Sequence, residues 1–112
     1  MAFRIEAGGR SFVYSGDAGL CDELRTLVQD ADLLIHWCYR GDGETVHPML
    51  DRLSPTPSQI ADMAREAGVK RLVLTHFRKH MDGPTLTHAR NALRDRFGPN
   101  AHVAEDLDTW EL

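Results

Sequence analysis

Residues 56–76 read TPSQIADMAREAGVKRLVLTH and contain the signals for a helix followed by a buried strand. Thr56 is a good helix N-cap, the proline after it suits the first helical position, and Gln59 completes a Thr-x-x-Gln capping box. Gly68 supplies the left-handed residue that commonly ends a helix. The mostly apolar run over 70–76 is typical of a strand that is buried on both faces.

The rest of the chain continues this alternation of strands and helices. Gly8 and Gly9 indicate a hairpin turn between the first two strands. Residues 40–53 lack periodicity and are predicted to form a loop. The order is ββαβαβαββ, which places the chain in the α/β class with a mixed sheet. We predict strands over 3–7, 11–15, 32–37, 70–76, 101–105 and 109–112, and helices over 20–30, 56–67 and 84–97.

The composition is that of an ordinary globular domain, with 42% apolar and 27% charged residues in 112 positions. We therefore treat residues 1–112 as one domain. The net charge of −4 gives no basic surface, so direct nucleic-acid binding by this chain is not expected. No signal peptide or membrane span is visible, and Cys21 and Cys38 form no disulfide or metal-site pattern, so a soluble cytoplasmic protein is expected.

Three side chains able to bind metal or move protons follow predicted strands, namely Asp17, His36 and His76. Ligands of open α/β sheets bind outside the carboxyl ends of the strands, where these residues lie. Carboxylate and imidazole groups are also common metal ligands. On spacing alone, Asp17 is better explained as a cap for the following helix, and each histidine as a hydrogen-bonded structural residue. His80 has i,i+4 spacing to His76, but it precedes the expected helix.

Four segments, in order, resemble the carboxyl-terminal half of metallo-β-lactamase-fold hydrolases, particularly the ribonuclease Z-like branch. The resemblance implies half of an αββα sandwich, with a mixed sheet and helices packed on one face. The four segments are YSGDAG at 14–19, ADLLIH at 31–36, the helix–strand unit at 56–77, and VAEDL at 103–107.

The same resemblance implies roles for individual residues. Asp17 would bridge two divalent cations, zinc or alternatively manganese or iron, and His76 would bind one of them. Ser15 and Thr75 flank these positions, and His36 is expected to be a buried or nearby residue rather than a ligand. Such a pair of cations polarises a substrate and activates water for hydrolysis.

Two parts of the family pattern are missing. The His-x-His-x-Asp-His signature, which normally lies well upstream, has no counterpart here. Trp37 stands where the ribonuclease Z branch commonly has glutamate, and Ser54 where it has histidine, which argues against authentic transfer-RNA 3′ processing. We expect Trp37 to be a packing residue instead. Because two side chains are too few to hold two metals, the isolated chain is expected to bind metal weakly and to be inactive.

Two hypotheses follow. The chain is half of a metal-dependent hydrolase for phosphodiester or ester-type substrates, and a complementary amino-terminal half supplies the missing ligands. Alternatively, it stands alone as a non-catalytic module that forms a homodimer by packing the apolar sheet faces of two copies together.

Overall fold

The computed structural model describes residues 2–44, 48–51, 53–77 and 83–105, which form a five-stranded sheet with helices. The predicted α/β class is confirmed, and the loop expected at 40–53 contains one short helix, α2. The predicted strand at 109–112 lies outside the described residues. In chain order the elements are β1 (Phe3–Ala7), β2 (Arg10–Tyr14), α1 (Asp22–Leu27), β3 (Leu33–Trp37), α2 (Pro48–Asp51), α3 (Pro57–Glu66), β4 (Leu72–Thr75), α4 (Gly83–Arg96) and β5 (Ala101–Val103).

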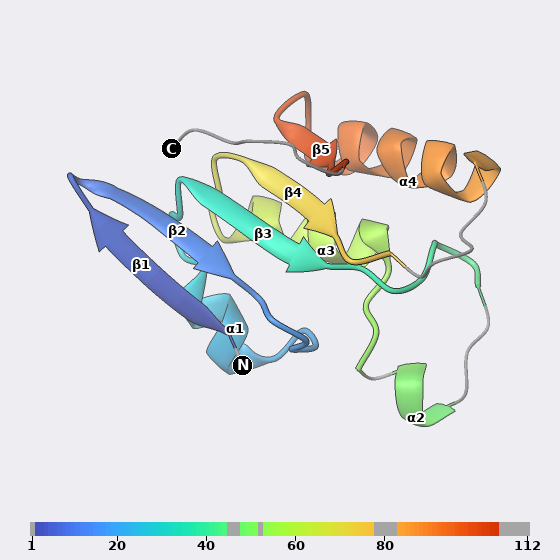
Figure 1. Cartoon of the computed structure of the whole chain (residues 1–112), viewed down its shortest axis with the longest axis horizontal. Helices are drawn as coiled ribbons and strands as arrows, with labels where there is room; N and C mark the ends of the chain where they lie inside the picture. The colour runs from blue at the N-terminus through green and yellow to red at the C-terminus, as the bar shows by residue number, and fades with distance from the viewer. Residues whose placement is uncertain (1, 45–47, 52, 78–82, 106–112) are drawn as a thin grey trace.

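The strands lie in the order β1-β2-β3-β4-β5, so neighbours in sequence are neighbours in the sheet. β1 is antiparallel to β2, whereas β2 through β5 are parallel to one another. Figure 1 shows the arrows of β2, β3 and β4 pointing the same way. This mixed sheet places the carboxyl ends of its parallel strands along one rim.

The helices α1, α3 and α4 pack their apolar residues into one core on one face of the sheet (Figure 1). Alternate residues of each strand enter that core because successive side chains point to opposite faces. The strand residues of the core are Val13, Leu34, Leu72 and Leu74, and the helices add Leu24, Ile60, Ala61, Met63, Ala64 and Leu93. No helix in the described ranges is long and apolar enough to cross a membrane.

Both predicted ends of α3 are confirmed. The Thr56 side chain accepts a hydrogen bond from the Gln59 amide at 3.2 Å, and the Gln59 side chain accepts one from the Thr56 amide at 2.9 Å. Gly68 has a φ of 78°, and an added Cβ would lie 2.5 Å from an Asp30 carboxylate oxygen. Glycine is therefore favoured there by conformation, and any side chain would also have to displace the Asp30 carboxylate.

Asp32 connects the amino-terminal ends of β2, β3 and β4, at the end of the sheet opposite the rim. Asp32 accepts bonds from the Ser11 amide at 2.8 Å and from the Lys70 ammonium at 3.0 Å. The Ser11 amide, followed by Lys70, lowers the pKa of the Asp32 carboxyl. The aspartate of the ADLLIH segment thus has a structural role.

The opposite face of the sheet is free of helices in the described part of the chain and is covered unevenly. Leu33 on β3 and Val73 on β4 are buried, with exposed fractions of 3% and 0%. On β1, by contrast, Phe3 is 43% and Ile5 51% exposed. The apolar surface that remains open is therefore concentrated at the β1 side of the sheet.

Candidate functional site

Asp17 and His76 lie at the same rim of the sheet. Asp17 follows β2 and His76 follows β4, and both residues are exposed. These strands flank β3 and run parallel to it, so their carboxyl ends meet at one edge. Two strand spacings separate the backbones by roughly 10 Å. The sequence-based expectation of a common rim is therefore met, and both side chains face the solvent there.

Ser15 fixes the turn that carries Asp17. It is fully buried, and its amide donates to the Ile35 carbonyl at 3.0 Å. Its hydroxyl accepts a hydrogen bond from the Trp37 amide and donates one to the Gly16 carbonyl, each at 3.0 Å. Gly16 then turns the chain with a φ of 58°. These bonds hold the carboxyl ends of β2 and β3 together directly before the aspartate.

Trp37 provides a second restraint on this turn. Its indole N–H donates to the Ala18 carbonyl at 2.7 Å, on the far side of Asp17 from Ser15. The ring is nearly buried, in agreement with the expected packing role. The indole hydrogen bond could not be predicted from the sequence, because its acceptor is a backbone carbonyl 19 residues away. The indole therefore restrains the rim.

His76 adopts an unusual backbone conformation, with a φ of 64°. Left-handed non-glycine residues are uncommon, and they concentrate at functional sites, where the surrounding structure enforces them. The preceding residue, Thr75, is half-buried at the end of β4, and its carbonyl accepts a hydrogen bond from the Cys38 amide at 2.8 Å. This bond ties β4 to β3 just before the histidine.

His36 lies in the core rather than at the open rim. It points to the same sheet face as Leu34, toward the helices, and is fully buried. Its Nδ1 atom is 2.6 Å from the Trp37 carbonyl, which can only accept, so Nδ1 carries the proton. The Nε2 atom has no hydrogen-bond partner among the described residues. Burial lowers the pKa of His36 to about 4.

The two cysteines differ in environment. Cys38 is buried, its thiol donates to the Arg40 carbonyl at 3.2 Å, and burial raises its pKa to about 12. Cys21 is exposed at the start of α1 and is a free thiol, as is Cys38. Thiolate chemistry is thereby excluded for Cys38 near neutral pH.

Within the residues described, no three His, Cys, Asp or Glu side chains gather closely enough to hold a metal ion. His80, the other half of the i,i+4 pair with His76, lies outside the described ranges. Of the residues singled out in the sequence, the rim therefore carries one carboxylate and one imidazole, on the turns after β2 and β4.

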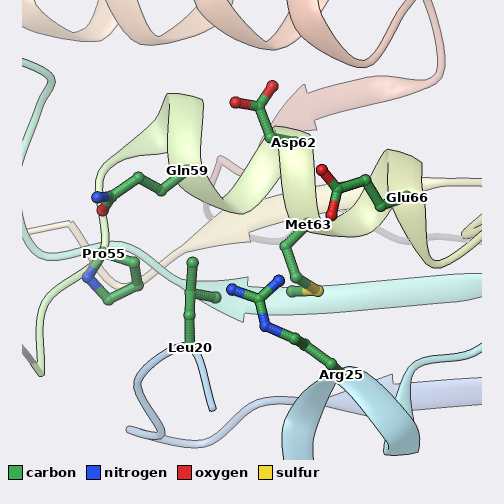
Figure 2. Close-up of a pocket in the computed structure, with 7 residues that line it drawn as sticks. All are labelled: Leu20, Arg25, Pro55, Gln59, Asp62, Met63 and Glu66. Atoms are coloured by element: carbon green, nitrogen blue, oxygen red, sulfur yellow. The ribbon is translucent and has the colours of Figure 1, made fainter. Parts of the chain in front are cut away.

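A hollow of about 440 Å³ lies between α1 and α3, away from these rim residues. Figure 2 shows Arg25 extending from α1 toward Met63 of α3. Leu20 and Pro55 form its apolar part, and charges of both signs surround it. Neither Asp17 nor His76 lines it, and the one lining residue noted in the sequence, Gln59, was noted only for its capping role. Its remaining lining residues are Gln59, Asp62 and Glu66.

A five-stranded mixed sheet with helices on one face fits half of a metallo-β-lactamase fold. The family model of the beta-lactamase superfamily domain matches residues 1–77. The chain belongs to this superfamily.

Relatives of known name agree with this assignment. The chain is 38% identical over 111 residues to a ribonuclease Z of Methanosarcina mazei and 33% identical over 104 residues to one of Bacillus cereus. These matches cover 93% of this chain and 33% of each relative, so the chain spans about a third of their length.

Two solved structures share the fold. The metallo-beta-lactamase fold protein YhfI of Bacillus subtilis superposes with a TM-score of 0.77 at 24% identity, covering 93% of this chain and 41% of that one. The short form of human tRNase Z gives a TM-score of 0.68 at 28% identity, covering 96% and 35%. The predicted partial metallo-β-lactamase fold of the ribonuclease Z-like type is thus confirmed.

Proposed function

We propose that this chain is the carboxyl-terminal half of a metal-dependent hydrolase that acts on phosphodiester or ester-type substrates. The observation that carries the proposal is that Asp17 and His76 lie on the same rim of the sheet. Asp17 follows β2 and His76 follows β4, the two strands that flank β3. The left-handed backbone of His76 supports a functional role, because such conformations are enriched at sites.

The two side chains fit part of a divalent metal centre. A carboxylate can bridge two cations, and an exposed imidazole can bind one of them, with zinc the first candidate and manganese or iron the alternatives. When bound, the metals supply polarisation of the substrate and an activated water. Two protein ligands fall short of the three that a catalytic zinc usually takes. The isolated chain is therefore expected to bind metal weakly and to lack activity.

The missing ligands would come from a complementary amino-terminal half. The relatives support this, because two-thirds of their length has no counterpart in this chain. We propose phosphodiesters and esters in general rather than transfer RNA because of Ser54. This residue is buried, and its carbonyl accepts a hydrogen bond from the Arg40 guanidinium at 2.6 Å. A serine held in this way does not replace the histidine that the ribonuclease Z branch commonly has there.

The metal part of the proposal is tested by calorimetric titration of the chain with Zn²⁺. The native chain should show weak binding that Asp17→Asn and His76→Gln each abolish. His88→Gln is the matched control, because His88 is exposed on α4 and lies 4.0 Å from the Asp42 carboxylate rather than beside Asp17. Binding that survives both rim substitutions, or that His88→Gln removes, would contradict the assignment of the ligands.

The hydrolase part is tested with bis(p-nitrophenyl) phosphate. The chain alone should leave this ester intact. Addition of the part of the Methanosarcina mazei ribonuclease Z that this chain does not match should produce hydrolysis that depends on Asp17. If both halves fold and associate and yet no hydrolysis appears, the chain is not a working half of a hydrolase.

A non-catalytic dimer remains the second candidate, and the exposure of Phe3 and Ile5 favours it. In that case two copies would pack sheet against sheet, and no metal-dependent hydrolysis would arise under any combination of halves.

A further inference from the structure

β1 is an edge strand, and its outer side presents backbone groups that β2 does not use. Gly8 and Gly9 have φ values of 59° and 75°, as in the two-residue turns that suit a hairpin. The turn makes Ala7 and Arg10 the first hydrogen-bonded pair, and such pairs recur at every second residue. Ile5 therefore directs its N–H and C=O toward β2.

The hydrogen bonds of β2 confirm which β1 residues direct their backbone groups toward β2. The Ser11 amide donates to Asp32, and the Ser11 carbonyl accepts from the Asp32 amide, so Ser11 faces β3 rather than β1. Its partner in β1 is Glu6. The N–H and C=O groups of Glu6, and those of Arg4 two residues earlier, consequently point outward from the sheet.

This edge has neither proline nor a bulge, two of the usual protections against pairing. Natural edges are blunted by proline, bulges, short length or charges that project from the edge. All five residues of β1 are paired with β2 without a bulge, and none is proline. Arg4 instead turns toward the end of α1, where its guanidinium donates to the Leu27 and Gln29 carbonyls at 2.8 and 2.9 Å. The opposite edge, β5, has three residues and is protected by its shortness.

The helix-free side of the same strand is apolar. Ile5 is half exposed, and Phe3 packs edge-on against the rings of Phe12 and Tyr14, with centroids 6.2 and 5.7 Å apart. An open backbone edge beside exposed apolar side chains is the arrangement by which one strand recruits another.

We propose that two copies of this chain pair through β1 in antiparallel fashion, with the two-fold axis at Ile5. Arg4 then lies opposite the partner's Glu6, and Ile5 opposite the partner's Ile5. The charges are complementary across the strands, as they are within one chain, where Arg4 and Glu6 form an ion pair at 2.8 Å. The dimer forms one continuous sheet, and it does not depend on the hydrolase function proposed above.

The outward direction of the Glu6 amide provides a selective test. Glu6→Pro removes this N–H without removing a bond of the β1–β2 hairpin, because proline is tolerated where the N–H of an edge strand faces solvent. Sedimentation equilibrium should show a dimer for the native chain and a dimer dissociation constant raised roughly tenfold or more by Glu6→Pro. Ile5→Lys places two like charges at the axis and should have a similar effect.

Leu53→Lys is the matched control, because Leu53 is 56% exposed but lies away from β1. It should leave the dimer intact. A native chain that is monomeric, or a dimer that Glu6→Pro leaves unchanged while Leu53→Lys weakens it, would overturn the proposal. Circular dichroism of each variant establishes that the loss of the dimer is not a loss of the fold.

A cross-link defines the register. At a non-hydrogen-bonded antiparallel pair the two Cα atoms lie about 4.5 Å apart, within the range of a disulfide. In a Cys21→Ser background, Ile5→Cys should therefore oxidise to a covalent dimer, whereas Phe3→Cys should not, since its two copies lie roughly 14 Å apart. Equal cross-linking at both positions, or at Phe3 alone, would contradict pairing centred on Ile5. Face-to-face packing of the sheets would give such a result.

Discussion

Replacing His36 by asparagine will reduce the loss of stability that the native chain undergoes between pH 6.5 and pH 4. In the folded chain this imidazole is fully buried and neutral, and burial lowers its pKa from 6.5 to about 4. In the unfolded chain the same group has its ordinary pKa and takes up a proton as the pH falls below 6.5. The folded state is therefore disfavoured in acid.

Proton linkage determines the direction and the magnitude of this change in the free energy of unfolding. Above pH 6.5 the side chain is neutral in both states and adds no pH dependence. Below that value the unfolded state binds more protons, so the free energy of unfolding falls by up to about 1.4 kcal/mol per pH unit until the folded pKa is reached. The interval between 6.5 and about 4 corresponds to a total of about 3 kcal/mol. That is a large part of the 5–15 kcal/mol typical of a domain.

The measurement is urea unfolding of the native chain and of His36→Asn at several pH values from 7.5 to 4. Asparagine keeps a nitrogen donor near the position of Nδ1, so the bond to the Trp37 carbonyl can persist. Contributions of the remaining titrating groups cancel in the difference between the two proteins. Parallel pH profiles would refute the reasoning. NMR titration of the native imidazole provides a second measurement if the variant does not fold.

Three further substitutions test other restraints in the fold. Thr56→Ala removes the N-cap of α3 and should lower the free energy of unfolding by about 1 kcal/mol in urea melts. Gly68→Ala forces a left-handed alanine against Asp30 and should lower it by roughly 1–3 kcal/mol, and an unchanged melting curve would contradict the clash. Trp37→Phe keeps the packing but removes the bond to the Ala18 carbonyl, so amide exchange in residues 15–18 should accelerate, while exchange in α3 stays constant.

The fold was largely predictable because its signals are local. The capping box at Thr56, the stop at Gly68 and the glycine pair at Gly8 act within a few residues of themselves, and all three have the expected effect. The boundaries were less predictable, since the predicted helix over 20–30 shortens to Asp22–Leu27. The helix α2 was missed because its four residues are too few to show a period.

The positions of the candidate site residues could be predicted from the sequence, but the hydrogen bonds around them could not. Parallel strands force Asp17 and His76 to one rim, so the topology alone brings them there. The orientation of His36 toward the core follows from the alternation of side chains along β3, which a near-continuous apolar run does not reveal. The bonds of Ser15 and of the Trp37 indole depend on tertiary approach between strands far apart in sequence.

The rim is organised by bonds within this chain, and this determines what a complementary half has to supply. Ser15 and Trp37 restrain the turn of Asp17 from both sides, and the bond between Cys38 and Thr75 restrains the end of β4 before His76. The contribution of another half would therefore be further ligands rather than the placement of these two.

Because β1 lies at the edge of the sheet, pairing there extends the sheet sideways and leaves the carboxyl ends of β2, β3 and β4 open. The proposed dimer and the proposed metal centre are thus compatible, and each can fail its test without deciding the other.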